Sequence, residues 1–198
     1  VSHADKTLEH HFRPDFSSYH VVSYDTISGQ PHLKQTHQGF SDDSAWSRGQ
    51  AWGLYGYTSM YRLTGDARYL QHARNIAGFL LNHKNMPADG IPYWDFDSPD
   101  IPSTPRDASA AAIMASALVE LSGFVEPAEG ETYMAFAEKQ VRTLASPEYT
   151  AQPGENGDFI LLHSTGAYPF SSEVDVPLSY ADYYYLEALT RIKQKLQS

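Results

Sequence analysis

The stretch THQGFSDDSAWSRGQAWGLYGY, residues 36–57, places two acids, one arginine and two tryptophans directly before a run of small and apolar residues. Over residues 46–63 such side chains fall on most sides of a helical wheel, which indicates a helix that is buried all round. Thr64 and Gly65 then give a helix-stop signal. The sequence therefore predicts an inner helix whose entrance is lined with polar and aromatic side chains.

The pattern of an inner helix followed by an amphipathic outer helix occurs twice. Residues 67–83 repeat apolar positions with a period of 3.6 behind the candidate N-cap Asp66. After a Pro-rich loop, residues 108–121 form a second small-residue helix, and residues 130–144 form its amphipathic partner. We further predict helices over residues 4–12 and 179–196 and a short strand within residues 18–25.

Two architectures place helices in this order, an α-solenoid and an α/α toroid. Long loops enter the inner helices at SAWSRGQAW, PRDASAAA and VDVPLSYADYYY, so acids, arginines and aromatic residues gather at their amino ends. A toroid brings those ends together at one pocket. We therefore predict an all-α fold of the toroid type in one domain, residues 1–198.

Composition excludes several classes of protein. The net charge of −10 and the sequence pI near 5.2 argue against nucleic acid or an anionic membrane as partner, because the chain has no basic cluster. The absence of cysteine excludes disulfide scaffolds and thiolate zinc sites. No apolar run approaches the roughly 20 residues that span a bilayer. The start, VSHADKTLEH, does not read as a signal peptide, and a leader upstream stays open.

Arg48 and Trp52 are the first candidate binding residues. Arg48 lies in the first turn of the first inner helix, where a guanidinium near free helix N–H groups suits a carboxylate ligand. Trp52 follows four residues later and so shares a face with Arg48, where its ring suits stacking on a sugar. The alternative is that Arg48 forms a salt bridge with Asp42 or Asp43.

Other polar residues near the entrances have simpler interpretations. His20, His37 and Gln38 lie in loops upstream and are hydrogen-bonding candidates. The acids Asp42, Asp43 and Asp107 precede inner helices, and we interpret them as caps. No His-x-x-x-His or paired-carboxylate spacing occurs, so we predict neither a metal nor a cofactor.

Six segments resemble, in order, the carboxy-terminal half of the unsaturated glucuronyl hydrolases, glycoside hydrolase family 88. They are SYHVVSYD, THQGFSDDSAWSRGQAWGLYGY, IPYWDFD, PRDASAAAIMASALVEL, LLHSTG and SSEVDVPLSYADYYYLEAL. The resemblance implies an (α/α)6 barrel and a substrate with a 4,5-unsaturated uronic acid at its non-reducing end. In this family an aspartic acid protonates C4 and activates the water that adds at C5, and the resulting hemiketal rearranges and releases the sugar.

The resemblance also assigns site residues. It matches Arg48, Trp52 and Gln38 to the family's substrate pocket and His20 to the histidine that contacts the unsaturated uronate. Ser171 and Ser172 fall near the loop that contributes to the next sugar subsite.

The family's catalytic aspartates lie in its amino-terminal half, and none of Asp42, Asp43 or Asp107 occupies their positions. An (α/α)6 barrel needs twelve helices, whereas the pattern here gives about six, which would leave a large apolar edge. We therefore predict a half barrel that is inactive by itself, completed by a missing amino-terminal half or by a second copy.

Alternative functions stay open at this point. One is an unsaturated rhamnogalacturonyl hydrolase, although that family has a differently spelled arginine-glycine motif, without the glutamine-alanine that follows Gly49 here. A second is a non-catalytic carbohydrate-binding half barrel, and a third is a purely structural α-hairpin protein. We expect a bacterial periplasmic or cytoplasmic location, with a preference for the periplasm.

Overall fold

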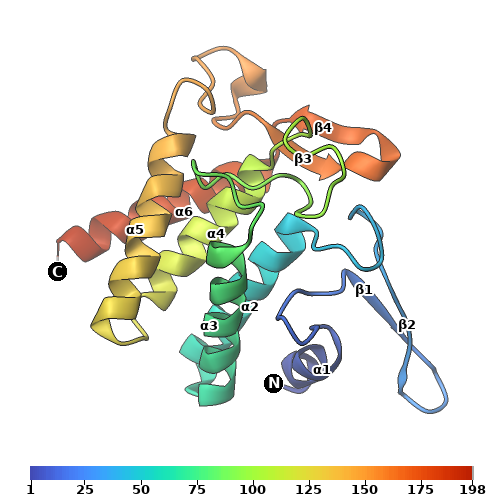
Figure 1. The fold of residues 1–198 in the computed structure, drawn as a ribbon. Helices are drawn as coiled ribbons and strands as arrows, with labels where there is room; N and C mark the ends of the chain where they lie inside the picture. Colours follow the sequence, from blue (N-terminus) through green and yellow to red (C-terminus); the bar gives the residue numbers. More distant parts are fainter. Residues whose placement is uncertain (198) are drawn as a thin grey trace.

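The computed structural model describes residues 1–197, about half of which lie in α-helices, with two short β-hairpins beside them (Figure 1). The helices are α1 (Ser2–His10), α2 (Ser47–Thr64), α3 (Ala67–Asn82), α4 (Ala108–Leu121), α5 (Pro127–Leu144) and α6 (Ser179–Leu196). The hairpins pair β1 (Val21–Tyr24) with β2 (Pro31–Gln35) and β3 (Ser164–Ala167) with β4 (Ser172–Val176). Two 3₁₀ turns are η1 (Asn156–Asp158) and η2 (Tyr168–Phe170). The predicted mainly helical class is confirmed.

Helix α4 forms the centre of the core, because every residue in it except Glu120 is buried. It packs against α2, α5 and α6, and α2 packs in turn against α3. Helices α3 and α5 each bury one side and leave the other side in solvent. This is the predicted alternation of inner and outer helices, and the predicted limits of the helices differ from the observed ones by at most three residues.

Two of the predicted caps are present. The Asp66 carboxylate accepts a hydrogen bond from the Arg68 N–H at the start of α3. The Asp107 carboxylate accepts from the N–H groups of Ser109 and Ala110 at the start of α4. Each cap satisfies helix N–H groups that have no partner within the helix.

The predicted capping role of Asp42 and Asp43 is wrong. Helix α2 begins after Trp46 without any side-chain cap. The Asp42 carboxylate instead accepts a hydrogen bond of 2.8 Å from the Thr36 N–H, and Asp43 is exposed. Asp42 therefore shapes the loop before α2 and has no part in starting the helix.

The sequence pattern predicted one strand, and the structure contains four. Within the predicted segment 18–25, the strand is Val21–Tyr24, and it pairs antiparallel with β2. The Asp25 carboxylate closes the turn between these strands by accepting from the N–H groups of Ile27 and Ser28. The β3–β4 hairpin was not predicted, because its position depends on contacts with distant parts of the chain.

The amino ends of α2, α4 and α6 gather on the side of the molecule that bears β3 and β4 (Figure 1). Backbone hydrogen bonds fix the loops that lead there, with the Ser47 N–H donating to the Trp94 carbonyl and the Phe96 N–H to the Ala45 carbonyl. The helix entrances thus lie on one side of the molecule, as predicted, but no residue of α4 or α6 lines the hollow described below.

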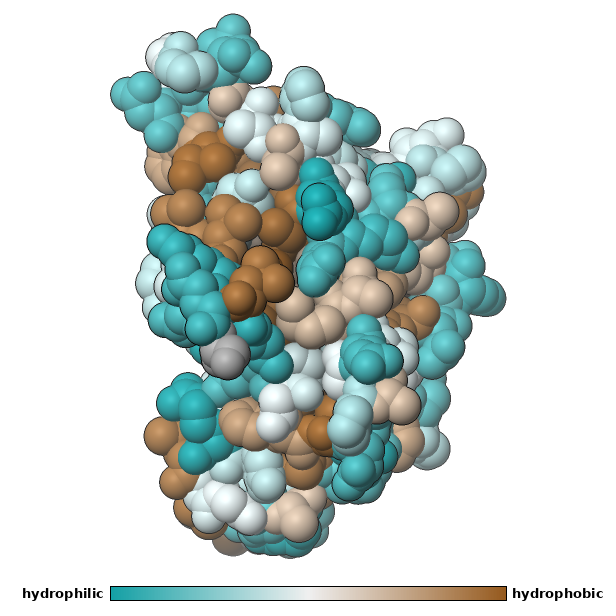
Figure 2. Space-filling view, turned by 90° about the vertical axis from the view of Figure 1, so that its left-hand side faces the viewer, coloured by the Kyte–Doolittle hydropathy of each residue, from teal (hydrophilic) through white to brown (hydrophobic). Residues whose placement is uncertain are grey.

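Within residues 1–197 no helix packs on one outer side of α6. Tyr183, Leu186 and Leu189 are 59%, 49% and 37% exposed there. Figure 2 shows apolar side chains gathered on the face that bears the carboxy-terminal end of the chain. Among the described helices none is long and apolar enough to cross a membrane.

Candidate active site

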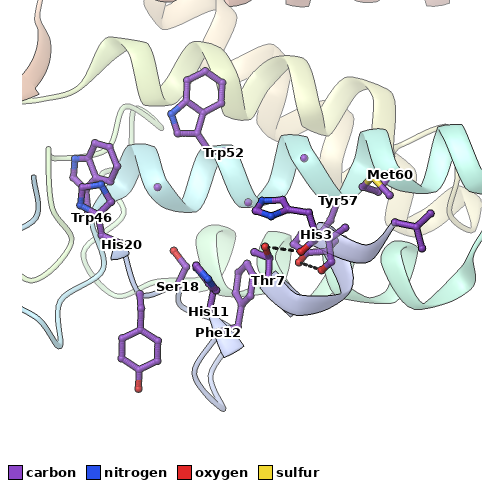
Figure 3. Close-up of a pocket in the computed structure, with 16 residues that line it drawn as sticks. His3, Thr7, His11, Phe12, Ser18, His20, Trp46, Trp52, Tyr57 and Met60 are labelled. Carbon is purple, nitrogen blue, oxygen red and sulfur yellow. Dashed lines mark hydrogen bonds between the residues drawn. The ribbon is translucent and has the colours of Figure 1, made fainter. Parts of the chain in front are cut away.

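A hollow of about 670 Å³ lies between α1, the segment before β1 and one side of α2. His20 and Trp46 lie together at the amino end of α2, and Trp52 follows along the same helix (Figure 3). Gly53 and Gly56 continue this wall without side chains. No Asp or Glu of residues 1–197 belongs to the lining, and its polar side chains are histidine, serine, threonine, tyrosine and tryptophan.

His20 is held in one orientation by contacts on its ring and on one nitrogen. Its Nδ1 accepts hydrogen bonds from the N–H groups of His37 and Gln38, both at 3.1 Å. Its ring lies over that of Trp46, with centroids 4.3 Å apart and an interplanar angle of 31°. Burial, followed by the neighbouring His37 and Arg48, lowers the pKa of His20 to about 4. His20 is therefore neutral at physiological pH.

Arg48 is 2% exposed and is surrounded by acceptors from this chain. Its Nη1 pairs with the Asp107 carboxylate at 2.7 Å and also contacts the Thr165 carbonyl, while Nη2 donates to the Gly166 carbonyl. The guanidinium carbon lies 4.6 Å from the centre of the Trp46 ring. The alternative partner suggested for Arg48, Asp42 or Asp43, is wrong, because the partner is the N-cap of α4.

Gln38 binds the same carbonyl as Arg48. Its Nε2 donates to the Gly166 oxygen at 2.9 Å. Two predicted pocket residues from different elements thus meet at the backbone of β3. This shared acceptor fastens the β3–β4 hairpin to the entrance of α2.

Asp95 is a residue that the sequence reasoning overlooked. It is fully buried, and its carboxylate accepts from the Phe40 N–H at 2.9 Å and from the Ser44 hydroxyl at 2.7 Å. Burial raises the pKa of Asp95, which these hydrogen bonds partly offset. The segment WDFD, in which acids alternate with aromatic residues, is the sequence feature that could have indicated a buried carboxylate here. Asp95 fixes the loop that positions Gln38.

Metal binding has no support in the part of the chain that the structure describes. Residues 1–197 contain no group of three or more His, Cys, Asp or Glu side chains placed to hold a metal ion.

No protein-family model matches the chain. Over 196 residues it is 52% identical to the unsaturated glucuronyl hydrolase of Formosa agariphila, an alignment that covers 99% of this chain and 48% of that protein. It superposes with a TM-score of 0.97 and 55% identity on the crystal structure of an unsaturated glucuronyl hydrolase specific for heparin, covering 100% of this chain and 53% of that one. Along its whole length the chain is similar to about half of an unsaturated glucuronyl hydrolase.

A more distant solved structure extends the comparison. It is a mutant unsaturated glucuronyl hydrolase from Streptococcus agalactiae complexed with dGlcA-GalNAc6S, 33% identical with a TM-score of 0.80, covering 92% of this chain and 48% of that one. The chain thus spans about half the length of the relatives that it matches. The predicted resemblance and the predicted fold, half of an (α/α)6 barrel, are confirmed.

Trp52 of α2 provides an aromatic wall of the hollow. It is partly buried, lines the hollow, and contacts Tyr184 edge-on at 5.2 Å between ring centroids. Tyr180 of α6 lies beside both Trp52 and Arg48. The centroid of its ring is 6.2 Å from that of Trp52 and 5.6 Å from the Arg48 guanidinium carbon. The shared face predicted for Arg48 and Trp52 is present, with Tyr180 beside both.

Ser171 and Ser172 lie at the tip of the β3–β4 hairpin and are exposed. Neither lines the hollow. Their neighbour Phe170 packs on His37, with ring centroids 4.7 Å apart, and His37 is 6.3 Å from His20. The hairpin tip is therefore next to the His20 end of the hollow, and the subsite role of these serines stays a prediction.

Proposed function

We propose that this chain is the substrate-binding half of a glycosidase that removes 4,5-unsaturated uronic acid from the non-reducing end of lyase-generated glycosaminoglycan oligosaccharides. The observation that supports this most is similarity along the whole chain to unsaturated glucuronyl hydrolases, one of them specific for heparin. In the proposed reaction an acid group gives a proton to C4 of the C4=C5 vinyl ether, and water adds as hydroxyl at C5 while its own proton returns to that group. The hemiketal formed then opens and the next sugar leaves.

The hollow suits the binding part of this reaction. Trp52 offers a ring face for the sugar, and His20 and Trp46 form the end wall. The lining formed by residues 1–197 has no carboxylate, whereas protonation of C4 requires an acid positioned at the carbon. We therefore propose that the general acid comes from the other half of the barrel, an amino-terminal half or a second copy.

In this proposal Arg48 has a structural role and does not bind the uronate directly. Its donors already bind Asp107 and the carbonyls of Thr165 and Gly166. It therefore holds the β3–β4 hairpin in place, and its charge is already balanced by Asp107. Direct contact with the substrate would require the hairpin to release Gly166.

The exposed apolar side of α6 supports a half barrel that needs a partner. Tyr183, Leu186 and Leu189 would be buried by the next helical hairpin of a ring. No observation favours the rhamnogalacturonan alternative, and the bacterial periplasmic or cytoplasmic location stays a prediction.

The test is the loss of unsaturated-uronate absorbance on adding an unsaturated heparin or chondroitin disaccharide, with intact mass and oligomeric state measured on the same sample. A saturated disaccharide is the matched control, because it has no C4=C5 bond. We expect the full polypeptide to consume the double bond and the 22.1 kDa chain by itself to leave it intact. Turnover by the isolated chain would contradict the proposed origin of the acid and would make Asp42 and Asp43 candidates.

The non-catalytic alternative is favoured by the same absence of a lining carboxylate. It predicts that the full polypeptide binds the disaccharide tightly and leaves the double bond intact. Heparin disaccharide is the first choice in both experiments, because identity is higher to the heparin-specific enzyme (55%) than to the Streptococcus agalactiae enzyme (33%).

A further inference from the structure

We propose that Tyr184 of α6 is a positioning residue for Trp52, because its ring fixes the plane of the indole on which a sugar stacks. Tyr55 of α2 and Glu187 of α6 hold Tyr184 in turn. The ligand in this inference rests on the proposed function, whereas the placement of the indole follows from contacts within residues 1–197.

The small side chains of α4 leave room for aromatic rings from its two neighbours to meet. Residues 108–117, the run ASAAAIMASA, are mostly alanine and serine, and all are buried. Helix α4 packs against both α2 and α6, whereas the backbones of α2 and α6 make few contacts with each other. Trp52 and Tyr55 lie three residues apart on one face of α2. Tyr180 and Tyr184 lie four apart on one face of α6, and the two faces meet through these rings.

Ring contacts with α6 orient Trp52, whose indole N–H forms no hydrogen bond within residues 1–197. Tyr184 contacts it edge-on, with ring centroids 5.2 Å apart and an interplanar angle of 75°. Tyr180 lies farther away, at 6.2 Å and 51°. Figure 3 shows Trp52 on the side of α2 that faces away from Phe12. Among the described aromatic side chains, Tyr184 therefore gives the indole its closest ring contact.

Tyr184 contacts Tyr55 in the same manner as it contacts Trp52. The ring centroids are 5.0 Å apart and the interplanar angle is again 75°. Aromatic pairs favour such edge-to-face angles, because the positive edge of one ring meets the negative face of the other. The Tyr184 hydroxyl forms no hydrogen bond within residues 1–197, so its ring provides both contacts. Two contacts of this kind restrict the rotation of the Tyr184 ring.

A polar cluster fixes the hydroxyl end of Tyr55. The hydroxyl donates to Glu187 Oε1 at 3.2 Å, and the Ser116 hydroxyl of α4 donates to Oε2 at 2.5 Å. Arg191 pairs with the same carboxylate at 3.5 Å and donates to the Ser116 carbonyl at 2.8 Å. The Glu187 and Arg191 side chains are 20% and 18% exposed, so water competes little for these bonds. Burial, and then the Glu187 carboxylate, raises the pKa of Tyr55 to about 12, so the hydroxyl remains a donor at neutral pH.

Tyr184 acts through Trp52, because Trp52 lines the hollow and Tyr184 does not. A ring that is fixed before binding loses little conformational entropy when a sugar stacks on it. Helix α6 therefore contributes to sugar binding without lining the hollow, by determining how the indole of α2 is presented.

The first experiment observes the Trp52 ring without ligand, by ¹⁹F NMR of the full polypeptide labelled with 5-fluorotryptophan. The Trp52 resonance is the one that Trp52→Phe removes. We expect one narrow signal in the wild type and a broadened or split signal in Tyr184→Leu, because the indole gains orientations. Tyr184→Phe keeps both ring contacts and should keep the narrow signal. A single narrow signal in Tyr184→Leu would overturn the inference, because it would show that the indole is fixed without Tyr184.

The matched control is Tyr61→Leu. Tyr61 lies nine residues beyond Trp52 on α2 and contacts Phe124 edge-on, with centroids 5.1 Å apart and an angle of 74°. Its replacement removes a ring contact of nearly the same geometry from a residue that does not line the hollow. The Trp52 signal should stay narrow. Broadening as large as that in Tyr184→Leu would overturn the positioning role, because it would reflect a general loosening of the helices.

Tyr55→Phe keeps the inference testable if Tyr184→Leu does not fold. This variant retains every ring and removes only the hydroxyl bond to Glu187. We expect the Trp52 signal to broaden, and to broaden less than in Tyr184→Leu. A signal as narrow as that of the wild type would overturn the anchoring of Tyr184 by Glu187.

Calorimetric binding of an unsaturated heparin disaccharide tests the consequence for the sugar. Tyr184→Leu should weaken binding about 2- to 10-fold, the value of one oriented aromatic contact. In a Trp52→Leu background the same change should have no further effect, because Tyr184 then has no indole to position. An effect of equal size in both backgrounds would overturn the inference, because Tyr184 would then act on the ligand by another route.

These measurements distinguish a failure of this inference from a failure of the proposed function. If the wild type binds the disaccharide and Tyr184→Leu binds it equally well, the inference is overturned and the proposed function stands. A wild-type protein that binds no disaccharide would overturn the proposed function, whereas the ¹⁹F comparison would still decide whether Tyr184 fixes the Trp52 ring.

Discussion

Arg48 and His72 are both buried next to the hollow, but Arg48 has charged and polar partners whereas His72 is surrounded by apolar rings. Arg48 is 2% exposed and has an ion pair with Asp107 as well as backbone acceptors. His72 of α3 is 7% exposed, its Nε2 has no hydrogen-bond partner among the described residues, and it packs against aromatic rings. A buried charge persists only where opposite charge and acceptors surround it, so Arg48 stays charged and His72 must stay neutral.

The largest effect should come from removing the partner of Arg48. Asp107→Ala leaves a buried guanidinium without its counterion and removes the cap of α4. We expect the free energy of unfolding to fall by about 3–5 kcal/mol, as for other buried pairs that lose one member. Chemical denaturation measures it, with Asp66→Ala as the matched control.

Asp66 also caps a helix, but its ion pair with Arg68 is exposed. Its replacement by Ala should cost about 1 kcal/mol. An equal loss in the two variants would show that Asp107 acts only as a cap and that its pair with Arg48 adds nothing.

The second effect concerns His72 and pH. Burial among Phe12, Phe16 and Tyr57 lowers the pKa of His72 to about 4. In the unfolded chain its pKa is about 6.5, so between these values the unfolded state binds a proton that the folded state does not. Stability should therefore fall as pH decreases from about 6.5 to about 4, by about 3 kcal/mol for this one group.

The measurement compares wild type with His72→Leu, which cannot titrate. Other histidines with lowered pKa values, such as His20 and His11, remain in both proteins. The difference between the two pH profiles therefore reports His72 alone. Parallel profiles from pH 7 to 4 would mean that His72 is not neutral in the folded protein.

The contrast between Arg48 and His72 also shows which parts of the site the sequence could reveal. The inner helices were predictable because small and apolar residues on all sides indicate burial, and the structure places α2 and α4 within one residue of the expected limits. The partner of Arg48 was not predictable, because Asp107 lies 59 residues away while Asp42 and Asp43 are close in sequence.

The β3–β4 hairpin and the orientation of His20 were missed for a related reason. Gly166 lies 128 residues from Gln38, and this hydrogen bond is one of the contacts that hold the hairpin at the site. The His20 ring depends on two backbone N–H groups from another loop. Such features depend on tertiary contacts, and neither helical periodicity nor residue type indicates them.

A smaller effect is expected from crowding the acceptor that Arg48 and Gln38 share. A Cβ added at Gly166 would collide with the Glu173 side chain on the neighbouring strand. Gly166→Ala should therefore cost about 1–3 kcal/mol through overpacking. It should also weaken disaccharide binding, because the hairpin would move from α2.

The matched control for that variant is Gly78→Ala. Gly78 lies inside α3, and a Cβ there would meet nothing within 4 Å, so the change should stabilise by up to about 1 kcal/mol. Thermal unfolding and calorimetric binding distinguish the two variants. A Gly166→Ala protein with wild-type stability would show that β3 and β4 move apart without cost and that the hairpin contact is loose.

The smallest effect should come from an ion pair at the opposite end of α2. Arg62 pairs with Glu120, but its side chain is 47% exposed, and Glu120 keeps a second partner in Arg191 at 3.0 Å. Because water screens an exposed pair and Arg191 still neutralises Glu120, Arg62→Ala should lower the free energy of unfolding by less than about 1 kcal/mol. High salt should reduce even that difference. A loss as large as that of Asp107→Ala would mean that burial and the number of partners do not determine how much an ion pair stabilises this protein. That result would contradict the explanation given above for a charged Arg48 and a neutral His72.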